Sequence, residues 1–150
     1  MIAIQSMDQE VNLLRNAIKS LLRNLGALEG ENAFCCDCTY AQCHTIVEVA
    51  ACGSLSLNEL ASRLNMDKSF MSRTVDDLVR KGYLSREQDP SDRRYIKIQL
   101  TEQGAQLYDE IELQSRNKFV ELLTGIQEGE RMLVIKGLEV LNLALKNLRT

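Results

Sequence analysis

Two short amphipathic patterns that lie almost end to end constrain the fold of this 150-residue chain more than any other feature. Ser56 followed by Glu59 is the signature of a capping box at the start of the first pattern. Asp67 is a typical N-cap for the second pattern, and Gly82 is a typical C-terminal stop. The apolar residues recur at helical spacing in both patterns, as Leu57, Leu60, Ala61 and Leu64, and then as Met71, Val75, Leu78 and Val79. With only a tight turn at Asn65 and Met66 between them, these patterns predict a helix-turn-helix.

The hydrophobic period changes immediately after this predicted motif. Residues 83–88 form a plausible strand, and residues 89–92 are dense in turn-forming side chains. Residues 95–100 then alternate, with Ile96, Ile98 and Leu100 on one face and Tyr95, Lys97 and Gln99 on the other. A β-hairpin that follows a helix-turn-helix indicates a wing.

Longer helical patterns flank this region on both sides. Thr39 with Gln42 forms a capping box for a helix that ends at Gly53, and the buried face of this helix is Cys43, Ile46, Val47 and Ala50. Thr101 caps another helix that ends near Gly125. Helices over 8–28 and from about Glu128 carry heptad-like apolar seams, namely Val11, Leu14, Ile18, Leu21, Leu25 and Leu28, and Val134, Leu138, Leu141, Leu145 and Leu148. These seams either pack on each other within one chain or form the interface of a symmetric dimer, and we expect the dimer.

Taken together, the patterns predict a mainly α fold of six helices with a small β-hairpin wing, in one domain. Residues of about 39–100 form the predicted DNA-binding lobe, and residues 8–28 and 102–149 form the predicted dimerisation helices. The first residues do not resemble an export signal, and no segment is apolar for the ~20 residues that a membrane span requires. We therefore expect a cytoplasmic protein.

The charge distribution favours a local anion-binding surface despite the net charge of −3. Residues 55–100 carry a net charge of +2, whereas the remainder of the chain carries −5. A basic middle between acidic ends is a weak signature of nucleic-acid binding, and chance surface variation can also produce it.

The predicted second helix of the motif presents side chains suited to reading DNA. Ser69, Ser72, Arg73 and Asp76 share its outward face, and short hydroxyl side chains allow a helix to enter the major groove, where arginine binds guanine through two hydrogen bonds. Lys68 and Ser69 lie in its first turn, where backbone N–H groups and the helix dipole favour a phosphate. Adjacent arginines in the wing turn suit a narrow minor groove, and a nearby aspartate can orient one of them. The predicted DNA-binding residues are Lys68, Ser69, Phe70, Ser72, Arg73, Arg86, Asp92, Arg93 and Arg94.

With these motifs the chain resembles the MarR family of bacterial transcriptional regulators, specifically over residues 39–107 and more loosely at both ends. The matching residues in the helix-turn-helix are Leu57, Glu59, Leu60, Ala61, Leu64, Asp67, Lys68, Ser69, Ser72, Arg73, Val75, Leu78, Lys81 and Gly82. Those in and after the wing are Asp89, Pro90, Asp92, Arg93, Arg94, Leu100, Thr101, Glu102 and Gly104. The resemblance implies a triangular homodimer with interlocked terminal helices, recognition helices in successive major grooves of a near-palindromic operator, and wings in minor grooves. Phe70 departs from the pattern, in which a small polar residue is usual, and it either touches a thymine methyl group or turns back into the core.

A cysteine cluster outside the family pattern is a candidate sensor. Cys35, Cys36 and Cys38 lie in one loop, with Cys43 and His44 one helical turn further on. The chain has five cysteines, an odd number that argues against a disulfide framework. Three close thiols can bind a soft metal or metalloid, or act as a redox switch. The competing interpretation is that Cys43 and Cys52 are small core residues and that the loop thiols are incidental.

Enzymatic functions have little support in this sequence. It contains no glycine-rich phosphate loop and no metal-binding histidine pair, and adjacent Cys43 and His44 point about a quarter-turn apart on a helix. The sequence therefore predicts a dimeric regulator that binds double-stranded DNA, most often a repressor in the family, with no certain cofactor and an effector that is a thiol-reactive species or a small organic ligand. The rivals are a winged-helix module that binds protein and, more weakly, a thiol-redox enzyme.

Overall fold

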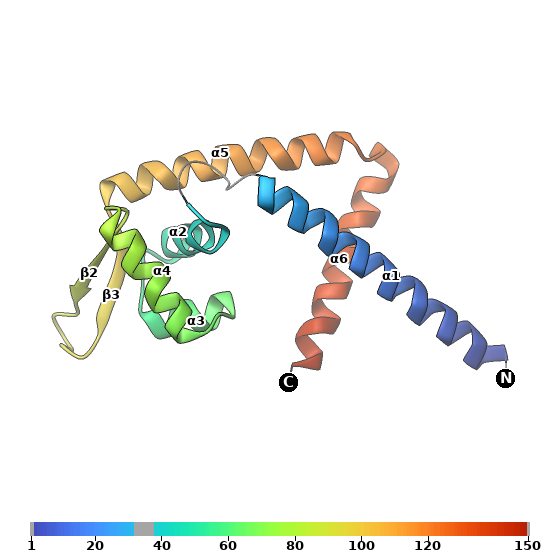
Figure 1. Ribbon diagram of the computed structural model, residues 1–150, viewed down its shortest axis with the longest axis horizontal. Coiled ribbons are helices and arrows are strands. Elements are labelled where there is room, and N and C mark those ends of the chain that lie inside the picture. The colour runs from blue at the N-terminus through green and yellow to red at the C-terminus, as the bar shows by residue number, and fades with distance from the viewer. Residues whose placement is uncertain (1, 32–37, 150) are drawn as a thin grey trace. The chain divides into compact units, whose positions relative to one another are not determined.

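The computed structural model describes the backbone of residues 2–31 and 38–149, and the side chains of residues 6–26 and 38–149. Its helices are α1 (Ile2–Glu31), α2 (Tyr40–Cys52), α3 (Leu57–Leu64), α4 (Lys68–Arg80), α5 (Glu102–Thr124) and α6 (Glu128–Leu148). Its strands are β1 (Ser54–Leu55), β2 (Leu84–Gln88) and β3 (Ile96–Leu100). The predicted winged helix-turn-helix fold, mainly helical with a small wing, is confirmed in this part of the chain (Figure 1).

The helix boundaries follow from the capping residues that the sequence contains. The Thr39 hydroxyl accepts a hydrogen bond from the Gln42 N–H at 3.2 Å, and the Gln42 side-chain oxygen accepts one from the Thr39 N–H at 3.0 Å. This complete capping box starts α2, and Gly53, with φ of 80°, ends it. Asn65 ends α3 in the left-handed conformation, which asparagine tolerates better than most residues, and so allows α4 to begin at Lys68.

The wing sheet has three strands in the order β1-β3-β2, all antiparallel. The short strand β1 pairs Leu55 with Ile98 of β3, and both side chains are buried. Strand β1 was not predicted from the sequence, because two residues are too few to show an alternating pattern. This extra strand joins the inner end of the wing to the helical lobe.

The core of the lobe lies between α2, α3, α4 and the wing sheet. Its fully buried side chains include Ile46 of α2, Leu60 of α3, Met71 and Leu78 of α4, and Ile98 of β3. The predicted inward faces of α3 and α4 are confirmed, with Leu57, Leu64 and Val79 only partly buried. This packing holds α4 so that its opposite face is exposed.

Three details of the sequence analysis need correction. α1 is longer than the predicted 8–28. Ala41, Thr45 and Val49 belong to the buried face of α2, whereas Ala50 and Val47 are only half-buried, because they lie at the edge of the side that packs on the lobe. Cys52, which one interpretation placed in the core, is exposed.

The chain divides into two compact units, Met1–Ile111 and Glu112–Thr150. Within the part of the chain that the structure describes, no helix combines the length and hydrophobicity needed to cross a membrane. None of the side chains of α6 is buried in the single chain, although the helix is rich in leucine. The exposed apolar residues of α6 therefore form the kind of surface that usually contacts another protein surface.

Candidate nucleic-acid interface

The outward face of α4 carries the predicted recognition residues. Lys68, Ser69 and Arg73 are exposed, and Ser72 is half-buried. Together with Leu57 of α3 these four residues line a shallow open hollow along the helix. The core side chains Met71, Val75 and Leu78 hold the opposite face of α4, so the polar face is displayed on a rigid element.

The first turn of α4 differs from the sequence expectation in one respect. The Asp67 carboxylate accepts hydrogen bonds from the backbone N–H groups of Ser69 at 3.2 Å and Phe70 at 3.3 Å. These N–H groups therefore already have an acceptor. A phosphate at this end of the helix would bind through the Lys68 ammonium and the Ser69 hydroxyl.

Phe70 does not turn back into the core. Its side chain is 42% exposed and lies in a second hollow between the start of α2 and α4. Arg73, Thr74 and Asp77 line the same hollow. Of the two interpretations of Phe70 that the sequence allowed, burial in the core is excluded, and contact with a thymine methyl group stays a prediction.

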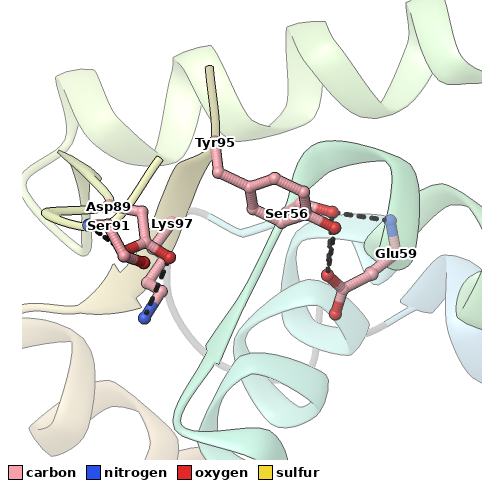
Figure 2. Close-up of polar contacts among 6 residues, drawn as sticks. All are labelled: Ser56, Glu59, Asp89, Ser91, Tyr95 and Lys97. Carbon is pink, nitrogen blue, oxygen red and sulfur yellow. Dashed lines mark hydrogen bonds and ion pairs between the residues drawn. The ribbon is translucent and has the colours of Figure 1, made fainter. Parts of the chain in front are cut away.

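The turn of the wing is ordered by Asp89. Its carboxylate accepts hydrogen bonds from the Ser91 hydroxyl at 2.7 Å and the Ser91 N–H at 2.9 Å, and the Lys97 ammonium lies 3.6 Å away (Figure 2). The Ser91 hydroxyl, then the Ser91 N–H and the Lys97 charge, hold the pKa of Asp89 below its ordinary value. Because its folded-state pKa is lowered, Asp89 contributes stability above pH ~4 that is lost as the pH falls through the lowered pKa.

The tip of the wing presents its arginines to solvent. The Arg94 side chain is 96% exposed, and its guanidinium Nε lies 3.9 Å from an oxygen of Asp92. The same Asp92 carboxylate accepts a hydrogen bond from the Arg94 N–H at 3.1 Å, which confirms that this aspartate and arginine are neighbours. Arg93 is also exposed. Both guanidinium groups can therefore reach a polyanion without leaving a buried site.

Arg86 is placed differently from the other predicted contact residues. It lies on β2, and its guanidinium forms an ion pair and hydrogen bond with Asp76 of α4. The two side chains are 38% and 49% exposed. Helical spacing places Asp76 on the reading face but does not pair it with Arg86, because opposite charges ten residues apart on different elements carry no local signal.

A second contact between the wing and the helical lobe also escaped the sequence analysis. The Tyr95 hydroxyl donates a hydrogen bond to the Glu59 carboxylate at 3.3 Å, and the Ser56 hydroxyl donates to the same oxygen at 3.1 Å. Figure 2 shows the Tyr95 ring directed toward Glu59 at the start of α3. The carboxylate that the sequence assigned to a capping box thus also serves as an acceptor for the wing.

A groove separates the wing from the starts of α3 and α4, and we call it the wing groove. Its volume is about 270 Å³. It brings together three of the predicted basic residues, which come from α4, β2 and the wing turn, and its lining is Ser56, Leu57, Asn58, Lys68, Arg86, Arg94, Tyr95, Ile96 and Ile98. Of the predicted residues, Lys68, Arg86 and Arg94 therefore converge, whereas Phe70 lies on the other side of α4.

The cysteine cluster is only partly visible, since Cys35 and Cys36 lie outside the described residues. Cys38 and Cys43 are buried in the lobe core, with 1% and 4% exposure. His44 is exposed, and its ring packs edge-on against Tyr40, with 4.1 Å between centroids. Among the described side chains, no three His, Cys, Asp or Glu residues are close enough to hold a metal ion. Cys38, Cys43 and His44 therefore do not make such a site by themselves.

Comparison with known proteins gives one family match. The model of the MarR family matches residues 38–96, which include α2, the helix-turn-helix and the wing turn. The HTH-type transcriptional regulator YdgJ of Bacillus subtilis is 28% identical over 81 residues. That match covers 54% of this chain and 49% of YdgJ, so the chain spans about half the length of this curated relative.

Solved structures of similar fold cover much more of the chain. Streptococcus pneumoniae FabT, solved in complex with DNA, aligns with a TM-score of 0.79 and 22% identity over 90% of this chain and 96% of FabT. Wild-type MarR from E. coli aligns with a TM-score of 0.63 and 25% identity over 70% of this chain and 78% of MarR. A MarR family protein from Bacillus stearothermophilus aligns with a TM-score of 0.79 and 19% identity over 93% of this chain and 97% of that protein.

Proposed function

We propose that this chain, whose residues 38–96 match the MarR family of winged-helix transcriptional regulators, binds double-stranded DNA as a dimer and regulates transcription. The observation that carries the proposal is the exposed face of α4, with Ser69, Ser72 and Arg73, beside a wing tip with Arg93 and Arg94. In this arrangement α4 enters a major groove, and the wing tip reaches the neighbouring minor groove. FabT, which shares the fold, was solved in complex with DNA, and this supports the proposal that the chain binds DNA.

The proposed dimer forms through the terminal helices. α1 exposes Val11, Leu14, Leu21 and Leu25, which belong to its predicted seam, and α6 exposes Val134, Leu138, Leu145 and Leu148 of its own. A helix that is apolar on most of its surface is normally buried by a partner. A second copy of the chain would bury both seams and set two copies of α4 about one DNA turn apart, for half-sites ~10 base pairs apart.

The match to a family of transcriptional regulators also supports the expectation that the chain is not an enzyme. Regulation of transcription requires access to the chromosome, so we place the protein in the cytoplasm. Repression is the expected direction of regulation, because a dimer bound over a promoter blocks it sterically.

Selection from a random-sequence duplex pool tests DNA binding directly. We expect the protein to enrich a near-palindromic site. Arg73→Ala should weaken binding to that site tenfold or more and relax base preference at one position in each half-site, because it removes a base contact. Arg94→Ala should weaken binding by a similar factor and flatten the salt dependence, because it removes a minor-groove cation.

The control is Arg116→Ala, which removes an exposed arginine of α5 outside the α4 face and the wing. It should change the affinity less than twofold. Parent-like affinity of both Arg73→Ala and Arg94→Ala would refute the assignment of helix and wing. Failure of the parent to enrich any duplex, together with capture of a protein partner that is insensitive to salt, would favour the protein-binding module instead.

We further propose that the cysteines of residues 35–38 sense a thiol-reactive effector, either a soft metal or metalloid or an oxidant. The supporting observation is the position of Cys38, which is buried in the core immediately before the cap of α2. A new bond to this sulfur would displace the start of α2 from the core, and α2 packs against α4 through the contact of Thr45 with Met71. A shift of α2 would therefore disturb the packing that positions the recognition helix α4.

Treatment of the protein with arsenite, zinc or peroxide tests this sensing role. We expect each active reagent to lower the affinity of the parent for its selected site by at least tenfold. The Cys35/Cys36/Cys38→Ser variant should keep its affinity, and Cys52→Ser, at an exposed thiol, serves as the control. An equal response of the triple variant and the parent, or an unresponsive parent, would refute thiol sensing and favour a small organic effector.

A further inference from the structure

We propose that Arg86 is a positioning residue, which fixes the wing against the recognition helix through Asp76, and that it does not itself bind DNA. The inference rests on the proposed DNA-binding function and changes the role of one residue in it. It also assigns a role to Asp76, an acidic residue on a face that should approach a polyanion.

The first feature is the contact itself. The Arg86 guanidinium lies against the Asp76 carboxylate in an ion pair that is also a hydrogen bond. Asp76 shares the outward face of α4 with Ser72 and Arg73, three or four residues earlier. The ion pair therefore links β2 to the face of α4 that is proposed to read DNA.

The second feature is the way in which the rest of the wing is held. Arg86 lies opposite Ile98 in the β2–β3 ladder, and Ile98 is buried and paired with Leu55 of β1. These contacts fix the inner end of the wing. Tyr95, immediately before the start of β3, donates to Glu59 of α3. The Arg86–Asp76 pair adds a charged contact from β2 to α4, so that the wing is joined to both helices of the motif.

The third feature is the contrast between Arg86 and the arginines of the wing tip. Arg94 is 96% exposed, whereas the Arg86 side chain is 38% exposed and already bound to a carboxylate. To bind a phosphate, Arg86 would have to leave Asp76 and expose that carboxylate to the same DNA. The tip arginines can bind without this cost, so they are the better contact residues.

The direction in which a substitution of Asp76 changes the DNA affinity separates the two possible roles of Arg86. Loss of an acidic charge from a DNA-facing helix should by itself strengthen DNA binding, because repulsion by the phosphates falls. If Asp76 positions the wing, Asp76→Asn should instead weaken binding. Exposed ion pairs contribute up to about 1 kcal/mol, and a dimer holds two, so we expect a loss of about 5- to 20-fold.

The affinity test uses a labelled 30-base-pair duplex that carries the site selected by the parent. Asp76→Asn and Arg86→Gln should each lose about 5- to 20-fold in affinity, and the exchanged variant Asp76→Arg/Arg86→Asp should recover most of that loss. The matched control is Asp77→Asn, which removes one acidic charge from the same helix but pairs with Arg80 and not with the wing. It should bind as tightly as the parent or slightly more tightly.

A second measurement on the free protein keeps this inference separate from the proposed function. Hydrogen exchange of the β2 and β3 amides should accelerate at least threefold in Asp76→Asn and Arg86→Gln, but not in Asp77→Asn. Unchanged exchange, or tighter DNA binding by Asp76→Asn, would overturn the positioning role. So would a loss in Arg86→Gln that the exchanged variant does not recover and that lowers the salt slope by about two, one for each protomer, because that result identifies a phosphate contact. A parent that binds no duplex would refute the proposed function, and the exchange data would still decide the role of the pair.

Discussion

Leu145→Asp is expected to convert the dimer into monomers and to abolish operator binding at concentrations where the parent is saturated. Leu145 is 46% exposed on α6 in the single chain, so an aspartate there is tolerable in a monomer. In the proposed dimer the same position faces a partner helix, and an unpaired carboxylate in an apolar interface costs several kcal/mol. Two such sites per dimer should raise the dimer dissociation constant by about a thousandfold or more. DNA affinity should then collapse, because each half-site is read by one protomer alone.

Light scattering after size-exclusion chromatography measures the oligomeric state of Leu145→Asp, and circular dichroism measures whether the monomer remains helical. The control is Lys136→Asp, which introduces the same carboxylate on the opposite face of α6 from Leu145, about two and a half helical turns away, where the Lys136 side chain is 74% exposed. It should remain dimeric and bind the operator. A dimeric Leu145→Asp variant that still binds DNA would show that this seam lies outside the interface.

Gly104→Ala is expected to destabilise the DNA-binding lobe strongly. A Cβ atom at Gly104 would lie 2.0 Å from the carbonyl oxygen of Tyr83 and 3.3 Å from a methyl carbon of Leu100. The Tyr83 carbonyl cannot move aside without loss, because it accepts a hydrogen bond from the Thr101 N–H at 3.0 Å. Relief of the overlap requires α5 to move away from the start of β2. We expect a cost of about 3 kcal/mol or more, which corresponds to a fall in Tm of about 10 °C.

Thermal unfolding at fixed protein concentration checks this expectation. The matched control is Gly129→Ala in the first turn of α6, where no atom lies within 4 Å of the added Cβ. Alanine is the better helix former, so this variant should be as stable as the parent or up to about 1 kcal/mol more stable. If Gly104→Ala unfolded at the temperature of the parent, the close packing of α5 on Tyr83 would not exist in solution.

The local signals in this sequence were sufficient for most of the fold. Caps such as Thr39 and Asp67 and the stop near Gly82 act within four residues of the backbone groups that they satisfy, so the boundaries of α2 and α4 could be read directly from the chain. The helical spacing of Leu57, Leu60 and Leu64 likewise predicted which side of α3 faces the core, because one face of a helix must be buried. The exposed face of α4 followed from the same periodicity, and the exposed tip of the wing followed from the turn-forming residues 89–92.

Only the tertiary structure decided which of the candidate residues act together. The contacts of Arg86 with Asp76, of Tyr95 with Glu59 and of Gly104 with Tyr83 join residues that are 10 to 36 positions apart. No local rule of spacing or capping relates such residues, because their separation in space depends on how the wing folds back onto α3 and α4. For the same reason β1 became a strand only through its pairing with β3, and Cys38 became a core residue only once α2 was packed. Side-chain type and local period thus determined the elements and their exposed faces, whereas long-range packing determined which exposed charges are available to a ligand and which are already paired.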